Sequence, residues 1–205
     1  MSVLVYTENW EGKFKKLSFE LVSYAFGIAR MLSTTVTAVS IGKVVETELK
    51  KLGDYGANKI INVANDQLST LDNQAYASVI SEISVKENAK IIVIANNNTG
   101  KAIAPRLSVR LKAGVGSGVS RLPLNLDPFT VYKRTYSGNA FAHLVIKSDV
   151  KILTLAQNSF DIVETANSAT IENMNASVDG SMLNTVIKDV QKQTGKIVLT
   201  DADIV

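Results

Sequence analysis

Hydrophobic and polar residues alternate in blocks along the first half of the chain, and each block predicts one structural element. Short runs of apolar or β-branched residues are typical of buried strands. Longer segments with apolar residues every three or four positions predict amphipathic helices. The pattern predicts strands at 3–6, 35–41, 59–63 and 90–95, and helices at about 17–32, 44–52 and 73–85.

The first helix has the clearest pattern. Its apolar residues recur at spacings of four, three, four and four, which places them on one helical face: Leu17, Leu21, Tyr24, Ile28 and Leu32. Ser18 is predicted to be the N-cap, which puts Glu20 in the first turn, near the positive end of the helix dipole. Gly53 is expected to end the second helix.

Beyond Gly118 the pattern changes. Closely spaced strand candidates at 129–136, 140–147 and 151–156 are joined by turns such as Ser137-Gly138-Asn139, which predicts hairpins. In the first half, strands that alternate with helices imply right-handed crossovers and a parallel sheet with both faces covered. The expected fold class is therefore α/β, with a doubly wound, mostly parallel sheet and additional antiparallel strands in the C-terminal half.

The C-terminal region gives weaker signals. Between 156 and 185 the chain contains no Lys or Arg and is rich in Asn, Ser and Thr, so this part is expected to be extended or loop-like. The apolar residues between 183 and 190 suit a helix by their spacing, but they also alternate as in a strand. Periodicity leaves both alternatives open.

The composition excludes several classes of function. With 205 residues, of which 46% are hydrophobic, the chain can form one substantial α/β domain, or one domain with an added segment. A net charge of only +3, from scattered cations with few aromatic residues between them, does not indicate a nucleic-acid partner. The absence of cysteine excludes disulfides and thiolate metal sites. Without a signal segment or an apolar stretch long enough to span a membrane, a cytoplasmic protein with no direct membrane insertion is expected.

The chain contains a single histidine, which limits the catalytic and metal sites it can form. Paired-histidine metal sites are excluded, and a serine hydrolase would have to combine His143 with Ser137 or Ser117. His143 lies in an alternating strand pattern, which favours a strand-surface or packed role over a catalytic one. No catalytic residue and no metal site is expected.

The glycine run Gly114-Val115-Gly116-Ser117-Gly118 superficially resembles a dinucleotide fingerprint. That fingerprint requires a strand before the glycines and a helix N-terminus after them. Here a helix precedes the run and two prolines, Pro123 and Pro128, follow it, so a structural turn or a glycine-tolerant strand is favoured. The residues after the first strand, 6–10, also lack a phosphate-binding pattern, which disfavours a nucleotide hydrolase or ligase.

The helix before the glycines carries the most informative charges. Pro105 fits best in a first turn, so the helix is expected to start near Lys101 or Ala102. Its apolar stripe consists of Ile103, Leu107 and Leu111. Arg106 and Arg110 lie along the edge of this stripe, where they form either a solvated rim or a contact with an acidic partner or a phosphate.

Four segments of the chain resemble sequence motifs of one known family, and they occur in the same order. The opening VLVYTENWEGKFKKLSFELVSYAFGIA is similar to that family's first strand, turn and long helix. The segment GKAIAPRLSVRLKAGVGSGVS matches at Gly100, Pro105, Arg106 and Leu111, and RTYSGNAFAHLVI matches at Arg134, Gly138, Asn139 and Ala140. The terminal TDADIV resembles a family segment that continues into glycines. Over essentially its whole length, the chain resembles the amino-terminal domain of the electron-transfer flavoprotein alpha subunit.

This resemblance implies a domain organisation. Residues 1–195 would form the amino-terminal domain, with an adenine-nucleotide alpha-hydrolase-like fold, and 196–205 would begin a linker to a carboxy-terminal FAD-binding domain that this chain lacks. FAD would belong to the full-length protein, with no cofactor-binding residue in this fragment, and AMP would be expected only in the beta subunit. The family's pattern also favours a strand at 184–193.

The resemblance also implies a function. The chain would be the scaffold and beta-subunit-docking domain of a heterodimeric carrier, not an enzyme, which passes electrons from acyl-CoA or other flavin dehydrogenases to a quinone oxidoreductase. The expected interface residues are Arg106, Arg110, Arg134 and Asn139. The alternative is a stand-alone adenine-nucleotide-binding α/β domain that uses the ends of the first and fourth strands.

Overall fold

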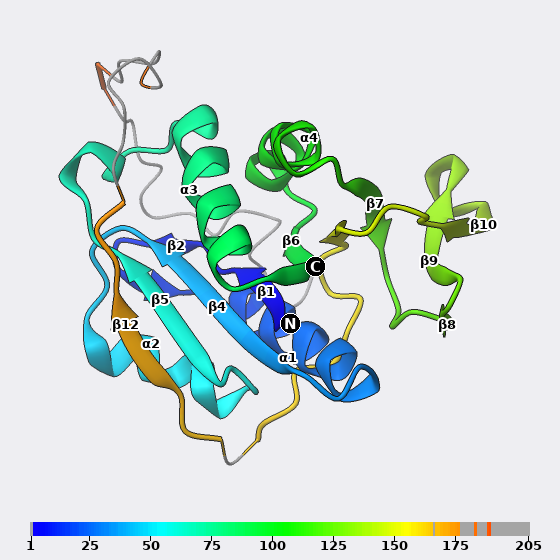
Figure 1. The fold of residues 1–205 in the computed structure, drawn as a ribbon, viewed down its shortest axis with the longest axis horizontal. Coiled ribbons are helices and arrows are strands. Elements are labelled where there is room, and N and C mark those ends of the chain that lie inside the picture. Colours follow the sequence, from blue (N-terminus) through cyan, green and yellow to red (C-terminus); the bar gives the residue numbers. More distant parts are fainter. Residues whose placement is uncertain (1, 166, 177–182, 184–187, 190–205) are drawn as a thin grey trace, which may run out of the picture.

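A parallel sheet runs through the centre of the structure, a computed structural model that describes residues 2–165, 167–176, 183, 188 and 189. Its seven parallel strands lie in the order β7-β11-β6-β1-β4-β5-β12 (Figure 1). Their bounds are Ser2–Tyr6 (β1), Thr35–Ile41 (β4), Lys59–Val63 (β5), Ala89–Ala95 (β6), Gly114–Val119 (β7), Lys151–Leu155 (β11) and Thr170–Asn173 (β12).

Three antiparallel strands extend this sheet beyond β7. They are β8 (Asn125–Leu126), β9 (Phe129–Thr135) and β10 (Ala140–Val145), and β9 pairs with β7, β8 and β10. The sheet therefore has β10 at one edge and β12 at the other. Two short strands, β2 (Asn9–Trp10) and β3 (Lys13–Phe14), form a separate hairpin after β1.

Four helices cover the two faces of the sheet. On one face α1 (Lys16–Met31) and α2 (Glu46–Asp54) bury residues such as Tyr24 and Leu49 in one core cluster. On the other face α3 (Asn73–Lys86) and α4 (Asn98–Leu111) bury Ile80 and Ile103 in a second cluster. Two short 3-10 turns, η1 (Asp66–Leu68) and η2 (Tyr136–Gly138), complete the elements.

The predicted fold class is confirmed. The four strands predicted in the first half are present to within one residue, because continuous apolar runs are what a strand covered on both faces requires. The helices predicted at 17–32 and 73–85 are also present. The glycine run forms strand β7, so the expectation of a structural role for these glycines is confirmed.

The predicted start of the first helix is wrong. Lys15 is the N-cap residue and makes no side-chain cap, while the Ser18 hydroxyl donates to the Glu8 carbonyl at 2.7 Å. Glu20 lies beyond the first turn and is almost completely buried. Its carboxylate accepts backbone N–H bonds from 158–160 at 2.8 to 3.0 Å, which ties the segment after β11 to α1.

The predicted ends of two other helices are also wrong. Gly53 lies inside α2, which continues to Asp54, and a Cβ at position 53 would lie 3.0 Å from the backbone of Ala169. Pro105 lies in the interior of α4, not in its first turn, because Asn97 caps the helix by accepting the Gly100 N–H at 2.9 Å. The Lys101 carbonyl, which loses its helical donor to this proline, belongs to an exposed residue that water can reach.

The strand predicted at 151–156 is present, but the expectation that it forms part of a hairpin is wrong. After β10 the chain returns to the parallel sheet, and β11 lies between β6 and β7. Ile152, Leu153 and Leu155 are completely buried, which is the pattern of a central parallel strand. In this part of the chain the antiparallel hairpin is formed by β9 and β10, and β8 pairs with β9 at its base.

The segment predicted to be extended contains one strand that the sequence did not reveal. β12 pairs in parallel with β5, and Glu172 forms ion pairs with Lys59 at 2.8 Å and Lys86 at 2.6 Å. These two ammonium groups lower the pKa of Glu172 to about 2. The strand predicted at 184–193 and the linker predicted at 196–205 lie, except for 188 and 189, outside the described residues.

The N-terminus of α4 packs directly on the end of β6, and only glycine fits there. A Cβ at position 100 would lie 1.7 Å from the Ala95 carbonyl oxygen. Gly100→Ala is therefore expected to lower the free energy of unfolding by about 3 kcal/mol, because the methyl group meets strand backbone that cannot move freely. Urea unfolding followed by circular dichroism measures this change.

The control for this experiment is Lys101→Ala, at the exposed next position of the same helix. It should change the free energy of unfolding by less than about 0.5 kcal/mol. An equally small effect of Gly100→Ala would mean that α4 does not approach β6 this closely.

Candidate functional site

The α4 helix presents its arginines outward. Ile103 and Leu107 are completely buried, so the predicted apolar stripe is confirmed. Arg106 and Arg110 are both exposed, and the Arg106 guanidinium donates to the Ala102 carbonyl of its own helix at 2.7 Å. Val109 lies between them and is 82% exposed. This outer face of α4 therefore combines two cations with an uncovered apolar side chain.

Arg134 and Asn139 lie on the β9–β10 hairpin, which extends the sheet beyond β7 (Figure 1). Both are exposed, Arg134 on β9 opposite Phe141 and Asn139 at the turn before β10. The structure thus brings the four predicted interface residues together as two pairs on two elements, not as one cluster.

One face of the β9–β10 hairpin lies on the same side of the sheet as α4. Phe129 and Val131 on β9 belong to the core cluster under α1 and α2. Because side chains alternate along a strand, Tyr132 and Arg134 point to the opposite side, where α3 and α4 lie. A single partner lying on this side could contact both pairs of predicted residues.

Three side chains on this side of the hairpin form a stack. The Arg121 guanidinium lies 4.5 Å from the centre of the Tyr132 ring, in a cation–π contact. The Tyr132 ring in turn stacks on the Phe141 ring, with centres 5.1 Å apart. Phe141 is nevertheless 59% exposed. Sequence reasoning missed this stack because the cross-strand register that brings Tyr132 and Phe141 together follows only from the observed pairing.

Positive charge is concentrated in this half of the molecule. The segment 98–156 contains only two acidic residues, Asp127 and Asp149, but nine basic ones: Lys101, Arg106, Arg110, Lys112, Arg121, Lys133, Arg134, Lys147 and Lys151. Within the described part of the chain, none of these nine cations forms an ion pair. The whole chain has a modest net charge, but the segment 98–156 is strongly basic. Lys133 is paired with Val119 of the cluster under α1 and α2, so this cation faces that side of the sheet, whereas Arg134 faces the side of α4.

The arrangement around His143 does not support a serine hydrolase. The histidine is exposed on β10, with its ring centre 5.9 Å from that of Tyr132. Among the described residues, no hydrogen bond joins it to Ser117 or Ser137, and no cluster of His, Asp and Glu could hold a metal ion. None of the described helices is long and apolar enough to cross a membrane.

A carboxylate lies between the carboxyl ends of β1 and β6, the topological switch point of the sheet. Open α/β sheets usually bind ligands at such a topological switch point. Here the Glu8 carboxylate accepts a hydrogen bond from the Asn97 amide at 2.9 Å and another from the Thr99 side chain. It therefore occupies the N-terminal end of α4, where a nucleotide phosphate would be expected, and its charge would repel that phosphate.

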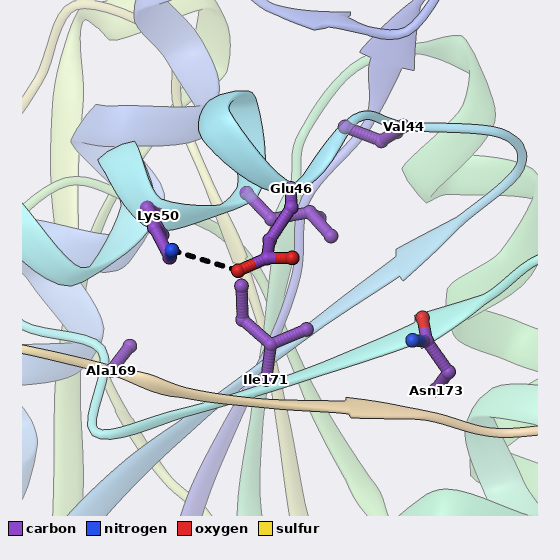
Figure 2. Close-up of a pocket in the computed structure, with 7 residues that line it drawn as sticks. Val44, Glu46, Lys50, Ala169, Ile171 and Asn173 are labelled. Carbon is purple, nitrogen blue, oxygen red and sulfur yellow. Dashed lines mark ion pairs between the residues drawn. The ribbon is translucent and has the colours of Figure 1, made fainter.

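A cavity of 390 Å³ lies between α2 and β12 (Figure 2). Its lining includes Ile171, Asn173 and the ion pair between Glu46 and Lys50, whose charged atoms lie 2.7 Å apart. Glu46 lies in the first turn of α2, so a negative charge already occupies the helix end that a pyrophosphate would need. The residues around this cavity do not fit a flavin dinucleotide.

Burial raises the pKa of the Glu8 carboxyl, and the hydrogen bonds from Asn97 and Thr99 and the charge of Lys15 only partly offset this. Stability is therefore lost as the pH rises from the unfolded pKa, about 4.3, through the folded pKa. Glu8→Gln keeps an acceptor for Asn97 and removes the charge. The variant should melt at a higher temperature than the wild type at pH 7, and this difference should vanish near pH 4.

Thermal unfolding at both pH values measures this effect. Glu82→Gln, at an exposed position on α3, is the control and should behave like the wild type at both. A Glu8→Gln variant that is less stable than the wild type at pH 7 would show that the charged carboxylate stabilises the folded protein.

Comparison with known proteins agrees with the resemblance carried by the sequence motifs. A family model described as the electron transfer flavoprotein domain matches residues 3–179. The electron transfer flavoprotein subunit alpha of Bacillus subtilis (strain 168) is 27% identical over 206 residues, which cover 99% of this chain and 62% of that protein. The acryloyl-CoA reductase electron transfer subunit beta of Anaerotignum propionicum is 29% identical over 135 residues, 66% of this chain and 37% of that protein.

Among solved structures, a universal stress protein from Archaeoglobus fulgidus is similar over 54% of this chain and 87% of its own, with 13% identity and a TM-score of 0.39. The chain spans less than two thirds of the length of either curated relative. The family match extends from β1 beyond β12, so it includes α4 and the hairpin. The chain belongs to the electron transfer flavoprotein domain family.

Proposed function

We propose that this chain is the scaffold and beta-subunit-docking domain of a heterodimeric electron transfer flavoprotein. In the complete assembly, electrons would pass from flavin dehydrogenases to a quinone reductase. The chain itself would perform no acid, base or nucleophilic catalysis, because the electron chemistry belongs to the flavin. Its task would be to hold the beta subunit and to support the flavin-carrying part of the assembly.

The basic surface of α4 and the hairpin is the observation that carries this proposal. Arg106, Arg110 and Arg134 are exposed and form no ion pair in the described chain. Exposed Val109 and Phe141 lie on the same two elements, and arginine and aromatic side chains are enriched at protein interfaces. Arginine and aromatic residues are enriched among the side chains that contribute most to binding. An acidic surface on the beta subunit would complement these charges and speed association.

We place the FAD and AMP sites outside this domain because of the residues at the two positions where it could have held a nucleotide. Glu8 lies at the topological switch point between β1 and β6, and Glu46 lies at the helix end beside the cavity at β12. Both carboxylates disfavour phosphate binding, which supports FAD and AMP sites elsewhere in the assembly. For the same reason the structure gives no support to a stand-alone adenine-nucleotide-binding domain.

Binding to the electron transfer flavoprotein beta subunit of the same organism tests the proposal. The double variant Arg106→Gln/Arg110→Gln is expected to weaken binding about tenfold, equivalent to ~1.4 kcal/mol, because it removes two of the cations that face the partner. The wild-type affinity should fall as salt concentration rises, and the variant should be less sensitive to salt. Isothermal titration calorimetry at several ionic strengths measures both effects.

The matched control is Arg30→Gln, which removes an exposed arginine on α1, on the opposite face of the sheet. It should leave the affinity unchanged to within about twofold. A wild-type chain that does not bind the beta subunit would refute the proposed function, whereas equal losses in the double variant and the control would refute the assignment to α4.

A further inference from the structure

The two edges of the sheet differ in how they are protected. β12 has only four residues, and Glu172 on it forms ion pairs with Lys59 and Lys86. β10 has the sequence AFAHLV, without Lys, Arg, Asp, Glu, Pro or Gly. Natural edge strands are normally kept from pairing with other strands by charges, prolines, bulges or a covering segment. β10 has none of these within the described residues, and it is longer than β12.

The hydrogen-bond pattern shows which backbone groups of β10 are available. The Ile146 N–H donates to the Phe129 carbonyl at 2.9 Å, and in an antiparallel pair bonded and non-bonded residue pairs alternate. In the register of the two strands, the residues of β10 that bond to β9 are therefore every second one before Ile146, namely Leu144, Ala142 and Ala140. The residues between them direct their N–H and C=O groups away from β9: Phe141, His143 and Val145.

The other side of β9 confirms this alternation. The Ser120 N–H donates to the Tyr132 carbonyl at 3.3 Å, and the Leu124 N–H donates to the Thr130 carbonyl at 2.8 Å. Tyr132 and Thr130 lie opposite two of the outward residues of β10, and their carbonyls point away from β10. The outer edge of β10 therefore offers three N–H and three C=O groups in a regular row.

Side chains beside this edge add apolar area and positive charge. Phe141 is 59% exposed and Val145 is 43% exposed, and both belong to outward residues of β10. Arg134 lies opposite Phe141, and Arg121 covers Tyr132. In the described chain no acidic side chain forms an ion pair with either arginine. The edge therefore presents an exposed apolar side chain on each side of His143, with positive charge beside them.

We propose that the outer edge of β10 pairs with a β-strand of the beta subunit whose flanking residues are Asp and Glu. In this mode of recognition, backbone hydrogen bonds supply affinity and alternate side chains supply specificity. The row at Phe141, His143 and Val145 supplies the backbone bonds, and the neighbouring arginines select an acidic partner. This inference rests on the proposed function, because it takes the beta subunit as the partner.

His143→Pro tests this inference without breaking the hairpin. The His143 N–H points away from β9, so proline removes an outward donor while every bond to β9 remains, and proline is tolerated at such edge positions. His143→Thr is the matched control, because it removes the imidazole and keeps the N–H in a residue suited to strands. In titrations with the beta subunit, we expect His143→Pro to bind about tenfold more weakly and His143→Thr to bind within about twofold of the wild type.

Each outcome of this experiment decides something different. If His143→Pro binds like the wild type, or if His143→Thr loses as much affinity, strand pairing at β10 is refuted, although the proposed function stands. If the wild type alone forms a dimer that His143→Pro dissociates, the edge is occupied by a second copy of this chain and the beta subunit is excluded there. If the wild type does not bind the beta subunit, the proposed function fails and this inference fails with it.

Amide hydrogen exchange of the wild-type chain gives a second test, which does not depend on the folding of a variant. Strand pairing should slow exchange at the outward amides of Phe141, His143 and Val145 at least tenfold when the beta subunit binds. The inward amides of Ala142 and Leu144, already bonded to β9, should change much less. Unchanged exchange at the three outward amides in a formed complex would overturn the inference.

Discussion

Seven parallel strands with apolar side chains on both faces need cover on both sides, and this requirement determines most of the architecture. The crossover helices supply the cover, α1 and α2 on one face and α3 and α4 on the other. α4 can do so only because Gly100 lets its N-terminus approach the Ala95 carbonyl, which no larger residue permits. Once Ile103 and Leu107 are buried, Arg106 and Arg110 must face outward.

The same requirement explains how the two halves of the chain are joined. After α4 the chain forms β7, a parallel strand of the central sheet, and the β9–β10 hairpin then extends the sheet beyond β7. The next strand, β11, lies back inside the parallel sheet, between β7 and β6. Glycines in β7 allow this return, since a Cβ at Gly114 would lie 2.6 Å from the Ile146 side chain. The hairpin is consequently attached to the domain through β7, with β10 at the edge of the sheet and one side uncovered by the described chain.

Charge follows this division of the fold. In the half built from β1 to β6, ion pairs such as those of Lys50 with Glu46 and Lys59 with Glu87 balance the cations locally. In the half built from α4 and the hairpin, the cations have no such partners among the described residues. A surface of this kind is costly for a protein to keep by itself because like charges repel, and an acidic partner removes that cost. The carboxylates of Glu8 and Glu46 place negative charge at two helix N-termini, where it would repel a phosphate.

The sequence by itself determined the first half of the fold and the family. Strands such as Lys59–Val63 were predictable because continuous apolar runs reflect burial on both faces, and the apolar stripe of α4 placed Arg106 and Arg110 at its exposed edge. The motifs around Gly100 and Arg134 were sufficient to suggest electron transfer flavoproteins. These are local signals, recorded within one turn of helix or one strand.

Only the tertiary structure decided which distant segments meet. β12 forms by pairing with β5, more than one hundred residues earlier in the chain, and Glu172 on it reaches two lysines of the first half. β11 joins the parallel sheet because its apolar run fits between β6 and β7. The stack of Tyr132 on Phe141 and the outward row of β10 depend on strand register, which periodicity does not specify. The arginines of the proposed docking surface were therefore visible in the sequence, but their arrangement depends on pairings between strands that no local pattern encodes.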